Sequence, residues 1–484
     1  MIVIAVPDKM PHKDLCRRAS PAYGAVPDED ECFMRGVLSG IFYGDMLEVA
    51  MDFITSDVKK LYGKYLAASM ASALVMSIYS FVDTIAVGQS EGPLGAAAMA
   101  VITPIYGVII FLAILCGVGG SVLYGHARGQ EKVEKANALF TAASGLMGVL
   151  TLLIWAAFLL FHRPILTFFG ADETLMSKVL EYARWIICFL PAFIVSTFIS
   201  AFIRNDGAPG LAMAGVIIGG CVNIIGDWFF VFPLGMGMKG AAIATVLGAC
   251  MQVIVMCTHF FTKRCTLRFV KPYQVMPAIR QTLNIGFGAG VLELGTVVLA
   301  IIMNNQILRY GDTTALAVYG VMATIMSLFQ ALYSGVGQAI QPIVSANCGA
   351  GRKDRIKQVW KLSLSTVAIL SLAFVALGEF FPEQIVRLFM EVTPEVLLVA
   401  PGIVRPYFLV FLFMGITVLS TYYLQSNMHG NMSMTVALLR SVFISGALMF
   451  VLPVFMGILG IWLAMPIAEL IVAVIALRYI KKRI

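Results

Sequence analysis

Side chains that carry oxygen atoms interrupt the apolar stretches in the first half of the chain. Asp83 lies in SFVDTIAVG with Tyr79 four residues before it, and Asn223 and Asp227 share GCVNIIGDWFF. A spacing of four residues places both members of each pair on one face of a helix. Thr245, within the small-residue run GAAIAT, adds a hydroxyl. Such hard oxygen ligands favour Na⁺ coordination, and two close buried carboxylates can instead share a proton.

These residues lie in a sequence with the composition of a membrane protein. Of the 484 residues, 60% are apolar types and 13% are charged, whereas about a quarter of a soluble chain is charged. The composition excludes a large water-soluble enzyme and a disordered protein. The net charge of +7 sits in short clusters between apolar stretches, which is typical of cytoplasmic loops and not of a nucleic-acid groove. The nine cysteines contain no CxxC pair, so neither a disulfide framework nor a zinc site is expected.

Two readings of the membrane carboxylates remain open. Ionisable groups at membrane depth are costly and mark function, which favours a functional role for Asp83 and Asp227. Polar side chains also hold neighbouring helices together, and Thr245 can bond back to its own helix. Two further acids, Glu293 in GAGVLELG and Glu469 in PIAELIV, either contact substrate or pair with a basic side chain such as Arg440; for Glu469 we favour the structural role.

The elements that must position these residues are membrane-spanning helices. A spanning helix needs about 20 mostly apolar residues, and twelve segments meet this requirement. The sequence therefore predicts an all-α polytopic membrane protein with spans near residues 62–88, 94–123, 137–161, 180–204, 209–231, 239–261, 281–308, 314–343, 359–381, 395–424, 433–456 and 458–480.

The distribution of basic residues predicts the orientation and the domain boundaries. Lys and Arg concentrate in alternate loops, such as 127–136, 263–280 and 349–358, so these loops and both termini are expected in the cytoplasm, with the helices in the plasma (inner) membrane. Residues 1–58 are predicted to be a disordered cytoplasmic extension without a cleavable signal. Two six-helix lobes are expected at 59–262 and 281–484, joined by the basic linker 263–280.

An internal repeat relates the two lobes. Gly117-Val118-Gly119 recurs as Gly335-Val336-Gly337, and FPLGMGMKGAAIA at 232–244 recurs as LPVFMGILGIWLA at 452–464. Six helices separate the copies, so both halves run in the same direction and a pseudo-two-fold axis along the membrane normal is expected. With the offset of 220 between the longer motifs, Asp227 falls on Ala447 and Asp83 near Met303. The ion chemistry is therefore predicted in the first lobe only.

The segment from IRNDGAPG to GAAIATV, together with SFVDTIAVG and QPIVSANCGAGR, resembles the multidrug and toxic compound extrusion (MATE) family, in particular its DinF-like and staphylococcal multidrug-exporter-like branch. The resemblance covers about residues 52–482. It implies an antiporter that exports amphipathic, often cationic compounds in exchange for Na⁺ or H⁺. Carried over by motif, the cation site comprises the residues Asp83, Asn223, Asp227 and Thr245, with Tyr79 adjacent. Candidate substrate contacts are Glu293, Asn304 and Gln341.

Two departures from the family pattern bear on the mechanism, and other functions fit the sequence less well. No acid appears on the tenth helix, and Ala67-Ala68-Ser69 stands where some members bend the first helix at a proline. A flippase for a lipid-linked oligosaccharide or other polyprenyl-phosphate lipid is the alternative; it needs a basic cavity, and only Arg405 and Arg440 are predicted at membrane depth. An intramembrane enzyme lacks a catalytic constellation, and a channel lacks a filter-like loop. The expected partners are an amphipathic small molecule and the bilayer, without nucleic acid, around a monomer with no cofactor besides the coupling ion.

Overall fold

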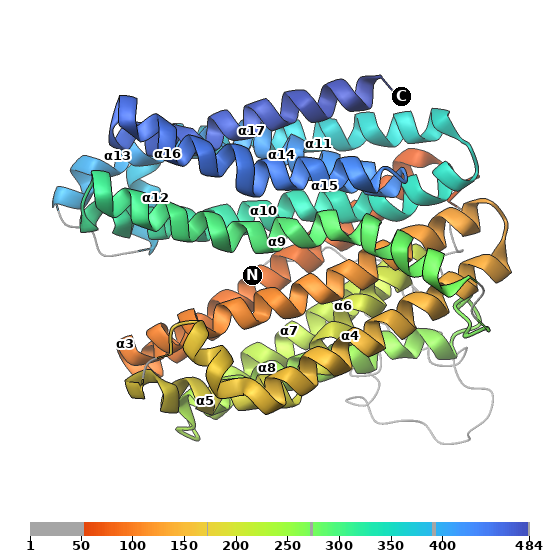
Figure 1. The fold of residues 1–484 in the computed structure, drawn as a ribbon, viewed down its shortest axis with the longest axis horizontal. Helices are drawn as coiled ribbons and strands as arrows, with labels where there is room; N and C mark the ends of the chain where they lie inside the picture. The colour runs from red at the N-terminus through yellow and green to blue at the C-terminus, as the bar shows by residue number, and fades with distance from the viewer. Residues whose placement is uncertain (1–52, 172, 272–273, 390–393, 483–484) are drawn as a thin grey trace, which may run out of the picture. The chain divides into compact units, whose positions relative to one another are not determined.

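The computed structural model describes residues 53–482, apart from residues 172, 272–273 and 390–393 (Figure 1). Nearly all of these residues are helical, and no strand occurs among them. Most of the predicted extension 1–58 lies outside the described residues. Residues 53–57 are described, and Arg355 donates hydrogen bonds to the carbonyl oxygens of Phe53 and Ser56 at 3.0 and 2.6 Å.

The first lobe contains six spans. Helix α3, Val58–Gly129, holds two of them, because it breaks at Gly92, whose φ of 63° lies in the left-handed region that glycine adopts without strain. The others are α4, Val133–Phe168; the pair α5, Glu173–Cys188, and α6, Leu190–Asn205; α7, Pro209–Val231; and α8, Gly237–Cys257, which continues as the 3₁₀ turn η1, Thr258–Phe261.

The second lobe repeats this order. It begins with α9, Val275–Tyr310, α10, Thr313–Gly349, and α11, Lys353–Phe380. The short α12, Pro382–Phe389, leads to α13, Pro394–Phe408, and α14, Phe411–Ser426. The last two spans are α15, Gly430–Leu438, continued through the π-helical turn η2, Leu439–Phe443, into α16, Ile444–Met456; and α17, Ile458–Lys481.

The spans agree with those expected from hydropathy. Ten helical segments are long and apolar enough to cross a membrane, and the pair α5 and α6, bent by 52° near Pro191, makes an eleventh. Proline at the start of α6 explains the break, since it cannot donate a backbone hydrogen bond to the preceding turn. Helix α9 covers the remaining predicted segment, 281–308. The all-α, two-lobe fold class is confirmed.

Glycines bring the two lobes into backbone contact on one side of the membrane. We call this the basic side; it is the side where the loops 129–133 and 349–353 lie. Gly129 packs against the backbone of Ala346, and Gly349 packs against that of His126. Both pairs are related by the offset of 220. Because a side chain at either glycine would overlap backbone atoms of the facing helix, the close contact at this seam depends on glycine at these positions.

The structure also corrects the register of the repeat. Gly117 faces Phe198 of α6: a Cβ at Gly117 would lie only 3.1 Å from the Phe198 Cα. Gly337 faces Tyr422 of α14. These two glycines thus pack against the fourth span of their own lobes. Gly335 instead faces Met70 across the seam, at 3.3 Å. Gly117 is therefore equivalent to Gly337, and the offset is 220 throughout, not 218 for the first motif.

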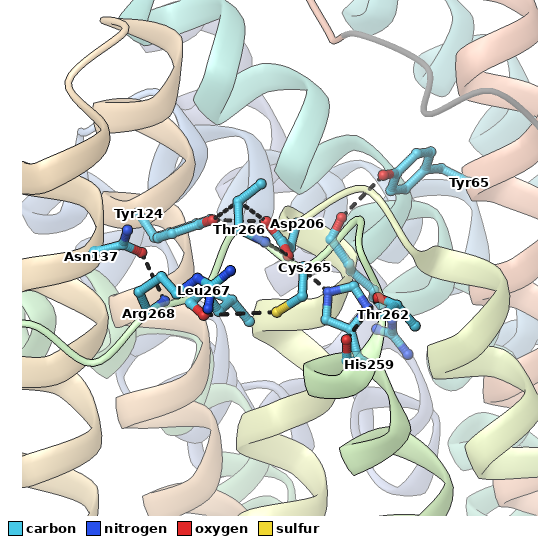
Figure 2. Close-up of polar contacts among 11 residues, drawn as sticks. Tyr65, Tyr124, Asn137, Asp206, His259, Thr262, Cys265, Thr266, Leu267 and Arg268 are labelled. Atoms are coloured by element: carbon cyan, nitrogen blue, oxygen red, sulfur yellow. Dashed lines mark hydrogen bonds and ion pairs between the residues drawn. The ribbon is translucent and has the colours of Figure 1, made fainter.

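A buried polar cluster attaches the interlobe linker to the first lobe (Figure 2). Asp206, between α6 and α7, accepts hydrogen bonds from the Thr266 backbone N–H at 2.9 Å, the Thr266 hydroxyl and the Tyr124 hydroxyl at 2.8 Å, and lies 2.7 Å from His259 Nε2. Burial raises the pKa of Asp206, but the hydrogen bonds from His259, Thr266 and Tyr124 outweigh it and hold the pKa below its ordinary value. Asp206, His259 and Cys265 lie close enough to bind a metal, yet both carboxylate oxygens already have partners. We therefore assign this cluster to holding the linker.

Candidate cation site and central cavity

Three of the predicted site residues are linked through hydrogen bonds inside the first lobe, and a fourth, Asp227, lies one helical turn from Asn223. Asp83 comes from α3, Asn223 and Asp227 from α7, and Thr245 from α8; the side chains of Asp83 and Asp227 are 6% and 1% exposed. The Asn223 amide donates to Thr245 Oγ1 at 3.1 Å, and this hydroxyl lies 3.3 Å from Asp83 Oδ1. The Thr245 hydroxyl also lies 2.9 Å from the carbonyl oxygen of Ala241, one turn earlier. Its single proton can serve only one of these two acceptors at a time.

Small residues let α7 and α8 approach closely enough for this arrangement. A Cβ at Gly226 would lie 2.8 Å from that of Ala244, and one at Gly248 would lie 3.1 Å from that of Asn223. The run GAAIAT and the glycines of α7 therefore serve packing, which is the usual role of small residues between membrane helices. This packing places Asn223 and Thr245 within hydrogen-bond reach.

Two tyrosines complete the site, and the sequence reasoning missed both. The Tyr182 hydroxyl from α5 donates to Asp83 Oδ2 at 3.1 Å, and the Tyr106 hydroxyl lies 3.2 Å from that of Tyr182. Tyr182 is 99 residues from Asp83 in the chain, so no local spacing connects them. The only signal is that a buried tyrosine hydroxyl needs a polar partner.

The predicted neighbour Tyr79 is half-buried on α3 and packs against α7, where a Cβ at Gly220 would lie 3.3 Å from its ring. Within the described part of the chain, its hydroxyl makes no hydrogen bond to the four site residues. The structure thus places Tyr79 beside the site and not among its hydrogen-bonding groups.

The unpaired oxygen atoms determine what the site can hold. Both carboxylate oxygens of Asp227 and the Asn223 amide oxygen are buried and have no hydrogen-bond partner among the described residues. The charge of Asp83 also acts on Asp227. Buried acceptors without a donor are costly, and two nearby carboxylates repel each other. A cation or a shared proton relieves both penalties, so this donor set fits Na⁺ or H⁺ and no negatively charged group.

A separate cavity of about 560 Å³ lies between the two lobes. Of the predicted substrate contacts, Gln341 lines it, whereas Asn304 is exposed on α9 and does not. The side chain of Glu293, also on α9, lies outside the described part of the structure. Arg204 lines the cavity as well. It lies in the last turn of α6, at the end of the fourth span.

Arg440 also lines the cavity, and it is held from behind by a buried acid. Its Nε donates to Glu469, which is fully buried on α17, and Thr417 donates to the other carboxylate oxygen. The Arg440 Nη2 donates to Gln330 Oε1 at 3.3 Å. Arg440 sits in the π-helical turn η2, a feature that recurs at functional sites. The pairing of Glu469 with Arg440 is confirmed, whereas Arg405, the other arginine expected at membrane depth, is exposed and does not line the cavity.

Comparison with known families decides the class of protein. The profile of the MatE family matches residues 68–229 and 291–448 of the chain, one segment in each lobe. The chain belongs to the MatE family. The family assignment made from the sequence motifs is confirmed, and MatE proteins are transporters, not enzymes.

Individual relatives and structures agree with this assignment. The chain is 24% identical over 431 residues to the multidrug export protein MepA of Staphylococcus haemolyticus, covering 88% of this chain and 94% of the relative. MepA of Staphylococcus aureus strain MSSA476 is 22% identical over 431 residues, which again cover 88% of this chain and 94% of the relative. A solved MATE transporter of the MOP superfamily in an outward-facing conformation superposes with a TM-score of 0.83 at 20% identity, covering 89% of this chain and 97% of that one. This MatE protein therefore is a multi-pass membrane protein whose fold matches that solved transporter over nearly its whole length.

Proposed function

We propose that this MatE protein is a secondary active antiporter that exports amphipathic small molecules in exchange for Na⁺ or H⁺. Its relatives include multidrug export proteins, which supports the direction of transport. We place the protein in the plasma membrane. The basic loops support an orientation in which the basic side and both termini face the cytoplasm. With that orientation, the conformer described here, sealed by glycines on the basic side, is the outward-facing one.

The observation that carries the proposal is the set of unpaired buried oxygens on Asn223 and Asp227 next to Asp83. Tyr182 and Thr245 orient the Asp83 carboxylate by hydrogen bonds to its two oxygens. Asn223 and Asp227 would then supply the remaining ligands to Na⁺, or the two carboxylates would share one proton. Movement of this ion down its gradient would supply the free energy for export.

Coupling requires the site to bind the ion with different affinity in the two conformers. The helices α3, α5, α7 and α8 converge on the site, so their relative movement changes its geometry. We infer that ion binding favours the outward-facing conformer and thereby lowers the affinity for substrate on that side.

Gradient-driven efflux from proteoliposomes tests this proposal. A Na⁺ gradient and a pH gradient are imposed separately on the wild type and on the variants Asp83→Asn and Asp227→Asn. Both variants should lose gradient-driven export while still inserting and remaining folded. Glu134→Gln, at an exposed acid of α4, is the matched control and should transport normally. Undiminished export by both site variants would falsify the assignment.

A further inference from the structure

The charged side chains that line the central cavity, counted among the described residues, have the opposite sign to those of the cation site. Among the described residues that line it, the charged side chains are Arg204 and Arg440. The carboxylates of Asp83, Asp227 and Glu469 are buried in the walls and do not line it. We propose that this cavity binds an amphipathic anion, an organic molecule with a carboxylate, sulfonate or phosphate group, with Arg204 and Arg440 as its charge partners. The proposal deepens the proposed function, since it assigns the substrate class of the transport cavity.

Arg440 is oriented to receive a ligand. Glu469 fixes its Nε and Gln330 accepts from its Nη2, which leaves the Nη1 group without a protein partner among the described residues. The guanidinium presents a rigid fork of donors that matches a carboxylate or phosphate. Glu469 already holds the guanidinium in place. Binding an anion therefore costs little additional conformational entropy of the arginine side chain.

Arg204 provides the stronger argument, because no acid among the described residues forms an ion pair with it. Its Nη1 donates to Gln338 Oε1 on α10, and no carboxylate in the described part of the chain lies within ion-pair distance. An uncompensated charge inside a protein is costly. The end of α6, where Arg204 lies in the last turn, offsets part of this cost through the helix dipole. An anion in the cavity would offset the rest.

A third donor lines the cavity one helical turn from Gln338, the partner of Arg204. The Gln341 side chain is 4% exposed, lines the cavity, and its Nε2 has no hydrogen-bond acceptor among the described residues. It lies three residues after Gln338 and so on the same face of α10. The acidic group of a ligand would supply the hydrogen-bond acceptor that the buried Gln341 Nε2 lacks.

The rest of the lining accepts an apolar body. Methionines from both lobes and the rings of Tyr319 and Tyr407 also line the cavity, and methionine adapts to varied shapes. Gln330 and Gln338, the partners of Arg440 and Arg204, are eight residues apart on α10, which corresponds to about 12 Å along the helix. A molecule of this length contacts one arginine with its acidic group while its ring system lies along the methionines.

Two dyes with the same xanthene ring and opposite charge test the proposal. Fluorescence anisotropy measures the binding of fluorescein, an anion, and of rhodamine 123, a cation, to the full chain in nanodiscs of zwitterionic lipid. Fluorescein should bind the wild type about tenfold or more tightly than rhodamine 123, the factor expected for one charge-assisted hydrogen bond. Tighter binding of rhodamine 123 would overturn the proposal.

Variants separate a ligand-binding role of the arginines from a structural one. Arg204→Gln should weaken fluorescein binding about tenfold without weakening rhodamine 123 binding, and Arg204→Lys should largely restore it. Arg440→Gln is combined with Glu469→Gln, so that no acid is left buried alone, and should also lose fluorescein selectively. Arg405→Gln, at an exposed arginine outside the cavity, should bind like the wild type. Unchanged fluorescein binding by the folded Arg204→Gln variant contradicts the proposal.

Competition identifies the source of the anion. Displacement of fluorescein by 2-naphthalenesulfonate indicates a soluble acid, displacement by dodecyl phosphate indicates a lipid-like phosphate, and either supports the anion site; displacement by neither overturns it. The assay uses no gradient. Anion binding without gradient-driven export would therefore refute antiport alone, whereas gradient-driven export of cations without anion binding would refute this inference alone.

Discussion

Adding one methyl group at the seam between the lobes should shift the conformational equilibrium. A Cβ at residue 129 would lie 2.7 Å from the carbonyl carbon of Ala346, and one at residue 349 would lie 2.8 Å from that of His126. Ordinary van der Waals contact begins at 3.4 Å. The obstructing atoms belong to the backbone, so no rotamer change relieves the overlap. Gly129→Ala and Gly349→Ala should therefore disfavour the conformer that is closed on the basic side.

The size of the effect follows from the packing. Overpacking a close-packed contact costs about 1–3 kcal/mol. The clash exists only in the closed conformer, so this free energy acts on the equilibrium between conformers and not on folding. A difference of about 1–3 kcal/mol changes the ratio of the two states by about 5–150-fold. Because the two glycines are related by the repeat, the two single variants should show similar shifts.

Distance measurements by double electron–electron resonance check this prediction. Spin labels replace Lys132 and Lys357, which are exposed on opposite lobes at the basic side, in a background without other reactive cysteines. Each seam variant should gain a population with a longer distance. Gly145→Ala and Gly320→Ala are the matched controls, since a Cβ at either position meets nothing within 4 Å. A distance distribution for Gly129→Ala and Gly349→Ala identical to that of the controls would refute the reasoning.

Three other substitutions probe the polar groups. Tyr182→Phe removes the hydroxyl that donates to Asp83; the loss of about 1 kcal/mol should raise the cation concentration for half-maximal efflux about fivefold, and an unchanged value would show that this bond is not part of the site. Glu469→Gln leaves Arg440 buried without its acid, which should cost about 3–5 kcal/mol and lower the thermal midpoint of the protein; adding Arg440→Gln should recover part of the loss. Asp206→Asn should lower the thermal midpoint at neutral pH. Because the pKa of Asp206 is depressed, its contribution is present above about pH 4 and is lost as the pH falls through the folded pKa, so the difference between wild type and variant should shrink in acid.

Local properties of the sequence were enough to predict the helices and to single out the residues of the candidate cation site. A spanning segment must be long and apolar, so hydropathy alone locates it, and the i,i+4 spacing of Asn223 and Asp227 places them on one helix face. The cost of carboxylates at membrane depth then singles out Asp83 and Asp227. These inferences use only local properties of the chain.

Features that depend on contacts between distant segments escaped prediction. Tyr182 reaches Asp83 across 99 residues, and Arg204 donates to Gln338 of α10 across 134 residues. The two-residue error in the first repeat motif has the same origin. A glycine triplet matches equally well in two registers, and only the partners of Gly117 and Gly337 on α6 and α14 distinguish them.

The first span of α3 offers a physical connection between the cation site and the cavity. Ser72, Met76 and Ser77 on this span line the cavity, and Asp83 lies six residues beyond Ser77, about 9 Å along the helix. From Val58 to Gly92 the backbone is helical, with its break at Gly92, and no proline lies between these two positions. A helix without an internal hinge transmits a shift at one end to the other. Ion binding at Asp83 that displaces this span must therefore also move the cavity wall on which Ser72 and Met76 stand, and bending at a proline is not required.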